Sequence, residues 1–169
     1  MNLELRLYPD KILGQKLEPV KVVNDDIRKL VKDMRETMYV EGGIGLAANQ
    51  VGERVRILVV DTQAGGARSM FQAFINPRLI NHFGEKVDME EGCLSFPDIR
   101  ELVARPDGVE MEYLDENGEP KAIRATGLMS RVLQHEYDHL EGKTMLDRIS
   151  AVRRLLLVKK LRDLRKAKV

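Results

Sequence analysis

The sequence predicts an α+β fold whose strands are mostly antiparallel. Apolar residues with helical spacing occur early, after the middle and at the end of the chain. Segments rich in β-branched residues lie between the first two of these helical patterns. Helices and strands do not alternate as repeated βαβ units, so a parallel sheet is disfavoured. The predicted order is therefore one helix, several strands and two further helices.

The first helix is predicted to begin at Asn24 or Asp25, either of which can cap it, and to end at Gly42 and Gly43. Its apolar residues recur every three or four positions: Ile27, Leu30, Val31, Met34 and Met38. We expect a buried strand over 55–61 and a second strand over 70–77, stopped by Pro77.

Residues 109–126 are predicted to form a hairpin that turns at Glu116-Asn117-Gly118. Its first arm alternates, with apolar Val109, Met111 and Tyr113 separated by two glutamates. A second helix is expected over 127–141 and a third over 150–169.

Composition indicates one soluble globular domain over residues 1–169, with 43% hydrophobic and 33% charged residues. The only cysteine, Cys93, excludes an internal disulfide and suits a reducing compartment. No apolar run approaches the roughly 20 residues of a membrane helix, and we see no signal peptide at the N-terminus. A cytoplasmic protein that does not associate with a membrane is therefore expected.

The second predicted helix contains the pattern His-Glu-x-x-His, formed by His135, Glu136 and His139. Histidines four residues apart lie about 40° apart around a helix and about 6 Å along it. Their imidazoles can therefore converge on one metal ion. Glu136 can project beside that ion, accept a proton from water and later deliver it to a leaving amine. Two histidines placed by chance on a surface helix are the alternative.

A catalytic metal usually takes three protein ligands, so the pattern needs one more. No histidine follows His139, as a metzincin protease would require. The remaining candidates are His82, which lies in an apparent surface turn, a carboxylate, and Cys93. Cys93 is the leading candidate, because a thiolate binds divalent transition metals well.

The Gly-rich stretch 42–52 does not match a dinucleotide loop, because Ala48 replaces the third glycine and a helix precedes it. Together with the other segments, it resembles the peptide deformylase family, whose three motifs occur here in the family's order. They are Gly43-Ile44-Gly45-Leu46-Ala47-Ala48-Asn49-Gln50, Glu91-Gly92-Cys93-Leu94-Ser95 and Gln134-His135-Glu136-Tyr137-Asp138-His139-Leu140-x-Gly142. The similarity extends to Tyr8-Pro9-Asp10 and Pro19-Val20, and the length and C-terminal helix resemble the bacterial class typified by Gram-negative enzymes.

The resemblance implies a hydrolase that removes the formyl group from N-formylmethionine at the start of new polypeptides and releases formate. It implies that Cys93, His135 and His139 bind one divalent metal at a central helix surrounded by the strands. In the family this metal is typically Fe²⁺, whereas the ligand types alone also suit Zn²⁺, Ni²⁺ or Co²⁺. Glu136 is implied as the acid and base.

The resemblance also assigns stabilisation of the developing oxyanion to the metal, the Gln50 side chain and the backbone N–H of Leu94. An extended substrate would pair its backbone with Ile44, Gly45 and Gly92. Helical spacing places two apolar residues on the turn before His135, where we expect them to line the methionine pocket. These residues are Leu128 and Val132.

The C-terminal segment 151–169 carries eight Lys/Arg and one Asp, a net charge of +7, whereas the preceding 150 residues carry −6. Leu157, Leu161 and Leu164 form an apolar stripe on the predicted helix. The segment is either a solvated helix packed on the body or an attachment to an anionic surface. The resemblance favours ribosomal RNA as that partner, for a monomeric enzyme.

Two other functions compete with deformylation. A metalloprotease that cuts internal peptide bonds would share the histidine pattern but would not explain Cys93, Gln50 or the Gly-rich stretch. A ribosome-associated binding protein with a structural metal would not need Glu136.

Overall fold

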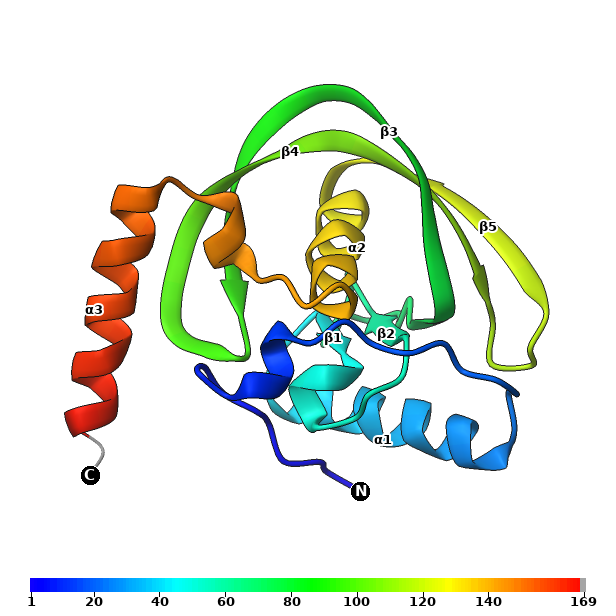
Figure 1. Cartoon of the computed structure of the whole chain (residues 1–169). Helices are drawn as coiled ribbons and strands as arrows, with labels where there is room; N and C mark the ends of the chain where they lie inside the picture. Colours follow the sequence, from blue (N-terminus) through cyan, green and yellow to red (C-terminus); the bar gives the residue numbers. More distant parts are fainter. Residues whose placement is uncertain (168–169) are drawn as a thin grey trace.

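The computed structural model describes residues 1–167 and contains one five-stranded antiparallel sheet (Figure 1). Each strand pairs with its neighbour in the sequence, in the order β1-β2-β3-β4-β5. The strands are β1 (Gly45–Ala47), β2 (Ile57–Val60), β3 (Gln72–Cys93), β4 (Phe96–Leu114) and β5 (Pro120–Ala125). The helices are α1 (Asp25–Val40), α2 (Gly127–Leu140) and α3 (Ala151–Ala167), with 3₁₀ turns η1 (Lys11–Gly14), η2 (Ala48–Val51) and η3 (Met145–Arg148). The predicted α+β class and antiparallel pairing are confirmed.

Helix α1 begins and ends where its sequence predicts. The Asn24 side chain caps it by accepting a hydrogen bond from the backbone N–H of Ile27 at 3.1 Å. Beyond its C-terminal end, Gly42 adopts a φ of +71°, which a glycine tolerates without a steric penalty. The predicted apolar face packs against the sheet, with Val31, Met34 and Met38 fully buried.

The prediction that the second strand stops at Pro77 is wrong, because β3 continues to Cys93. The pairing register between β3 and β4 shifts between Ile75 and Arg78, so Pro77 stands in an irregular position where no ladder donor is required. Asn76 there has a φ of +50°, and its side-chain amide pairs with the backbone N–H and C=O of Val20.

The second half of β3 gives little sequence signal because most of its side chains face solvent. His82, expected in a turn, lies within this strand opposite Val109, and it is exposed as predicted. The long β3–β4 pair curves over α2 like an arch (Figure 1). Cys93 is the last residue of β3 and stands directly before the turn into β4.

The predicted hairpin is confirmed by the β4–β5 pair. Its turn is closed by the Asp115 carboxylate, which accepts hydrogen bonds from the backbone N–H groups of Asn117 and Glu119. Gly118 takes a φ of +78°, as such turns require. The predicted alternation also holds, with Val109 and Met111 buried and Glu112 exposed.

Helix α2 is the centre of the molecule, and ten of its 14 residues are buried. The arch of β3 and β4 covers one side, while β1 and β2 lie on the other (Figure 1). A helix buried on nearly all sides can hold polar groups only if they find partners. The partners of its histidines and acidic residues must therefore come from the elements that pack around it.

Helix α3 packs beside the start of β4 through a second, smaller core. Of the predicted leucine stripe, Leu157 and Leu161 are buried in this core; the side chain of Leu164 and residues 168–169 lie outside the described residues. The other buried members of this core are Phe96, Ile99, Val103, Met145 and Leu146. Within residues 1–167, no helix is both long and apolar enough to span a membrane.

Gly142, directly after α2, fixes where this helix ends. It has a φ of +71°, and a Cβ at this position would stand 2.7 Å from the carbonyl oxygen of Gly14. The end of α2 and the η1 turn therefore approach each other closely only because Gly142 carries no side chain.

We expect Gly142→Ala to lower the free energy of unfolding by about 1–3 kcal/mol, because it adds both backbone strain and a steric clash. Denaturant unfolding at a fixed metal concentration measures this effect. Gly14→Ala is the matched control, since a Cβ there meets no atom within 4 Å. Equal losses of unfolding free energy in Gly142→Ala and Gly14→Ala would contradict the close approach of Gly142 to Gly14.

Candidate metal centre

Three side chains that can ligate a metal meet at the end of β3 and the face of α2. One ligand atom each from Cys93, His135 and His139 lies within 4.8 Å of the other two. The Cys93 Sγ stands 3.3 Å from the His139 Nε2. A tetrahedral metal with bonds of about 2.3 Å to sulfur and about 2.0–2.1 Å to nitrogen places such atoms about 3.6 Å apart. The three donors therefore fit one metal ion.

A buried carboxylate determines which nitrogen of His135 faces the other two donors. The His135 Nδ1 lies 2.8 Å from the Oε1 of Glu91, which is the first residue of the motif that contains Cys93. With Nδ1–H donated to the carboxylate, Nε2 keeps its lone pair for a metal. Glu91 thus connects the strand that carries Cys93 to the helix that carries the histidines.

Two buried arginines satisfy the remaining hydrogen-bonding capacity of Glu91. Arg105 on β4 donates through Nε to Oε2 at 2.6 Å and through Nη2 to Oε1 at 3.0 Å. Arg131 on α2 donates through Nη1 to Oε2 at 2.8 Å. Although burial opposes the charge, hydrogen bonds from His135 and Arg105 hold the pKa of Glu91 well below its usual range. Glu91 is therefore an ionised partner for His135.

Protonation of the two histidines differs because their surroundings differ. Burial, together with the neighbouring His135, lowers the pKa of His139 to about 3, so its imidazole is neutral. For His135, burial is outweighed by hydrogen bonds with Cys93 and Glu91, which raise its pKa well above the usual value. A metal ion that binds His135 would therefore displace a proton.

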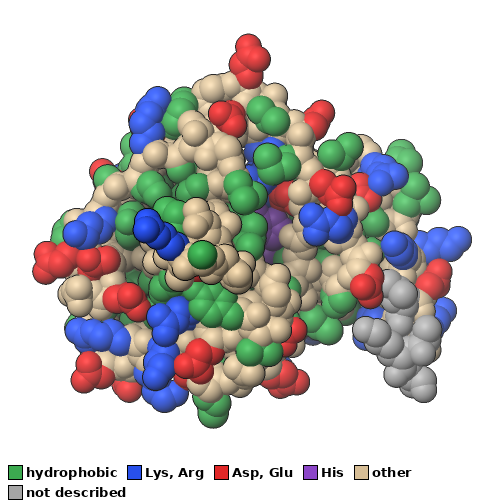
Figure 2. Space-filling view, turned by 180° about the vertical axis from the view of Figure 1, so that it is seen from behind, with side chains coloured by type: hydrophobic (Ala, Val, Ile, Leu, Met, Phe, Trp, Pro, Cys, Tyr) green, Lys and Arg blue, Asp and Glu red, His purple; other side chains and the backbone are tan. Residues whose placement is uncertain are grey.

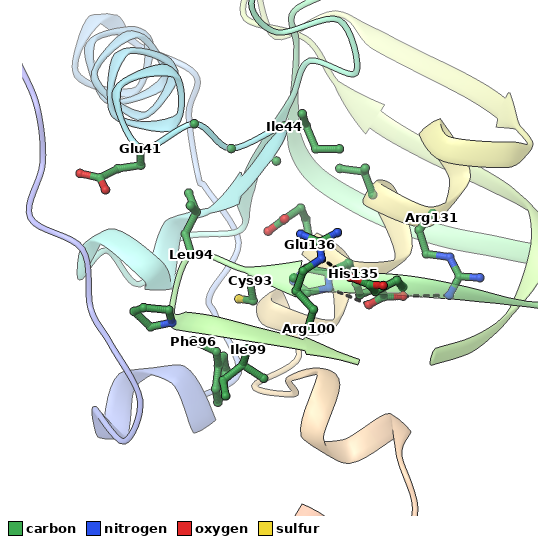
Figure 3. A pocket seen from close by; sticks show the side chains of 18 of the residues that line it. Glu41, Ile44, Cys93, Leu94, Phe96, Ile99, Arg100, Arg131, His135 and Glu136 are labelled. Carbon is green, nitrogen blue, oxygen red and sulfur yellow. Dashed lines mark hydrogen bonds and ion pairs between the residues drawn. The ribbon is translucent and has the colours of Figure 1, made fainter. Parts of the chain in front are cut away.

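Glu136 lies on α2 beside the three donors and lines the cavity in front of them (Figure 3). It is only 5% exposed, and burial raises its pKa to about 7. Its Oε2 has no hydrogen-bond partner among the described residues. A buried carboxylate oxygen without a partner is costly, so this atom is suited to a water or substrate group.

The Gly-rich stretch approaches Glu136 more closely than any side chain would allow. A Cβ on Gly45 would stand 2.6 Å from the Glu136 Oε1 and 2.7 Å from the Val132 Cγ1. A Cβ on Gly43 would stand 2.8 Å from the Leu94 Cδ1. These two glycines bring the backbone of β1 to the edge of the site.

Gln50 lies behind Cys93 and is held in one orientation. Its Oε1 accepts a hydrogen bond from the backbone N–H of Ala47 at 2.8 Å. Its Nε2 therefore points the other way and donates to the Cys93 Sγ at 3.4 Å and to the Ser95 Oγ at 3.2 Å. Gln50 is 1% exposed, so the amide is preorganised beside the sulfur.

A cavity of about 840 Å³ opens in front of these groups. All five predicted substrate-binding residues line it: Ile44, Gly45, Gly92, Leu128 and Val132. Cys93, Leu94, His135 and Glu136 line it as well. Figure 2 shows a histidine side chain recessed in a hollow between apolar side chains and backbone.

The structure thus brings together the residues that the sequence singled out, whereas His82 lies apart from the three donors on the exposed part of β3. Sequence reasoning missed Arg105 and Arg131, and it gave Glu91 no role. Neither arginine belongs to one of the motifs, so only the pairing of β3 with β4 and the packing of these strands on α2 reveal them. It also missed apolar residues of the cavity wall: Leu5, Leu7, Met89, Phe96 and Ile99.

Known proteins resemble this chain over nearly its whole length. The family model of polypeptide deformylase matches residues 2–155. A peptide deformylase of Picosynechococcus is 48% identical over 148 residues, which are 87% of this chain and 79% of the relative. A peptide deformylase of Brucella suis is 42% identical over 160 residues, with coverage of 95% and 91%.

Solved structures agree with these relatives. A peptide deformylase from Legionella pneumophila has a TM-score of 0.91 and 32% identity, covering 99% of this chain and 98% of that one. A peptide deformylase from Ehrlichia chaffeensis in complex with actinonin has a TM-score of 0.89 and 40% identity, covering 96% of both chains. With a cysteine and two histidines gathered at one cavity, the chain belongs to the polypeptide deformylase family.

Proposed function

We propose that the cavity binds the formylated N-terminus of a new polypeptide and that the residues around Cys93 catalyse its hydrolysis. The family fixes the reaction, which is removal of the N-formyl group from nascent peptides by a hydrolase. The assignment of roles to individual residues is ours. The observation that carries it is the close grouping of a cysteine with the two histidines of His-Glu-x-x-His.

Cys93, His135 and His139 would hold one divalent metal. When bound, such an ion would acidify water and polarise the formyl carbonyl, whose carbon is attacked. We propose Fe²⁺ as the ion in the cell, with Zn²⁺, Ni²⁺ or Co²⁺ able to occupy the same donors. The grouped Cys93 sulfur, the neutral His139 and the Glu91-bound His135 support one metal ion at these donors.

Glu136 is the proposed general base and acid. Its partner-free Oε2 takes the proton from the attacking water as the new C–O bond forms. As the C–N bond breaks, the same oxygen gives that proton to the departing methionine nitrogen, and the released formic acid ionises to formate in water. Its burial excludes bulk water from the proton transfer.

Gln50 and Leu94 are the proposed donors to the formyl oxygen. The Ala47 N–H fixes the Gln50 amide so that Nε2 faces the site, which limits the reorganisation needed during the reaction. Leu94 follows Cys93 in the β3–β4 turn, so its backbone N–H is carried next to a metal ligand. Such a donor typically contributes about 2.7–4 kcal/mol to transition-state stabilisation.

The substrate backbone would extend along Ile44, Gly45 and Gly92. In this arrangement the enzyme binds the main chain of the substrate and contacts few of its side chains. Leu128 and Val132 would contact the methionine side chain. Because the glycines of this stretch leave little room at Glu136, a small formyl group is favoured over larger acyl groups.

The wider properties are proposals as well. We propose a single catalytic domain over residues 1–169, a monomer in the bacterial cytoplasm, and membership of the class typified by Gram-negative enzymes.

Helix α3 is the proposed contact with ribosomal RNA. Leu157 and Leu161 anchor it to the body, which leaves basic side chains on the outer face. Lys159, Lys160 and Arg162 are exposed there. A basic helix fixed in this way can neutralise phosphates.

The metal-loaded chain is expected to release formate from a short formyl-methionyl peptide without cutting internal peptide bonds. Glu136→Gln keeps the shape of the side chain but removes the proton acceptor. We expect formate release to fall by about 10²–10⁴-fold at unchanged metal content. Formate assays and elemental analysis measure both quantities.

Internal cleavage without formate would favour the protease alternative. Normal turnover by Glu136→Gln would remove this residue from the proposed chemistry. A chain that binds metal but releases no formate would favour the binding-protein alternative.

Cys93→Ala is expected to lose tightly bound metal, because two histidines alone leave the site one ligand short. Elemental analysis after dialysis against a weak chelator measures the metal per chain. Gln50→Ala, which removes a contact to the sulfur but no ligand, is the matched control and should retain metal. Wild-type metal content in Cys93→Ala would show that the thiolate is not a ligand.

Replacing Lys159, Lys160 and Arg162 together with glutamine is expected to weaken co-sedimentation with ribosomes, and the difference should shrink as salt increases. Leu157 and Leu161 stay in place, so helix packing is preserved. The control carries the same charge change at exposed Lys21, Lys32 and Lys86. Equal co-sedimentation of both variants would contradict a specific role for α3.

A further inference from the structure

Arg148, at the end of η3, makes two hydrogen bonds with a carboxylate of the metal-binding helix. Its Nε donates to the Asp138 Oδ2 at 2.9 Å and its Nη2 to the Asp138 Oδ1 at 2.5 Å. The Asp138 side chain is 7% exposed, whereas the Arg148 side chain is 41% exposed. The pair therefore joins the surface of the C-terminal segment to the interior of α2.

From Asp138 a continuous series of ionic hydrogen bonds reaches the proposed metal ligand His135. Asp138 also accepts a hydrogen bond from the Arg105 Nη1 at 2.8 Å. Arg105 donates two hydrogen bonds to Glu91, and Glu91 holds the His135 Nδ1. Among these contacts, only those of Arg148 begin at a partly exposed side chain.

The fixed geometry of the Arg105 guanidinium explains why Arg148 matters to this series of hydrogen bonds. Arg105 uses Nε and Nη2 for Glu91 and has only Nη1 directed at Asp138. Because Arg148 binds both oxygens of Asp138, that single contact from Arg105 is sufficient. Without Arg148, Arg105 would be the only cation paired with the buried Asp138 carboxylate among the described residues. Asp138 would then draw Arg105 away from Glu91.

We propose that Arg148 is a positioning residue for the metal centre. It acts through Asp138 and Arg105, keeps both oxygens of Glu91 occupied, and so fixes the ring of His135. The inference rests on the proposed function, since it takes His135 as a metal ligand. Residue Arg148 of η3 thereby contributes to metal binding, although η3 lies outside the three motifs.

A role limited to attaching η3 to α2 would give a different result. Loss of such an attachment lowers the melting temperature but leaves the geometry of the metal ligands unchanged. Loss of a positioning residue changes metal release and the ligand field. Partners one step beyond the metal ligands typically change metal affinity by 10–100-fold, so a smaller change is expected from a residue further out.

The experiment uses the full chain loaded with Co²⁺, whose visible absorption reports the ligand geometry. The variants are Arg148→Ala, Arg148→Lys and, as a control, Arg78→Ala, which removes a surface pair between Arg78 and Glu112. We expect Arg148→Ala to release cobalt to a chelator about three- to tenfold faster than wild type, with a shifted spectrum. Arg148→Lys should release cobalt at a rate between those of wild type and Arg148→Ala, because lysine keeps the charge but not the two hydrogen bonds to Asp138. Arg78→Ala should match wild type.

A double-mutant cycle with Glu91→Gln tests the route. If Arg148 acts through Glu91, adding Arg148→Ala to Glu91→Gln should change cobalt release by less than about twofold. If the two substitutions instead multiply each other's effects on cobalt release, Arg148 does not act through Glu91. Should Glu91→Gln fail to fold, the test is whether the rate of cobalt release rises from wild type through Arg148→Lys to Arg148→Ala.

Wild-type cobalt release and spectrum in Arg148→Ala, with only a lowered melting temperature, would overturn the positioning role. Formate release by the wild-type chain is measured in parallel. Absent formate release with the expected cobalt differences would refute the reaction but support the role of Arg148. A wild-type chain that neither binds cobalt nor releases formate would refute both.

Discussion

The hydrogen bond between Glu91 and His135 is the interaction on which the rest of the site depends. It joins the end of β3, which carries Cys93, to α2, which carries both histidines, and it selects the nitrogen of His135 that faces the thiol. A bare carboxylate at this depth would be unstable. Arg105 and Arg131 therefore surround it, and they come from β4 and α2, the elements that must be held together.

The same arrangement explains why β3 and β4 form a long arch instead of short strands. Glu91 lies near the end of β3 opposite Glu101, whereas Arg105 lies further along β4 opposite Val87, and the Arg105 side chain reaches back along the strands to Glu91. The arch thereby covers the polar face of a helix that is buried on nearly all sides. Ionic partners from the strands take the place of an apolar interface there.

Close approach of backbone completes the site from the opposite side. Gly45 stands so near to Glu136 and Val132 that any side chain would displace them. Gln50, five residues later, is turned by η2 so that its amide reaches the sulfur of Cys93. One short segment thus supplies a smooth wall for an extended peptide and a donor beside the metal ligands.

The sequence by itself determined the class of fold, the cap of α1, the β4–β5 hairpin and the placing of two histidines on one helix face, because local spacing encodes each of them. His135 and His139 converge by helical periodicity, and the absence of a later histidine in the sequence left Cys93 as the leading third ligand. Local signals predicted wrongly that the strand stops at Pro77, since only the pairing with β4 shows a register shift there that requires no backbone donor. Glu91, Arg105, Asp138 and Arg148 became a network only in the tertiary structure, because strand register and helix packing determine which buried charges meet.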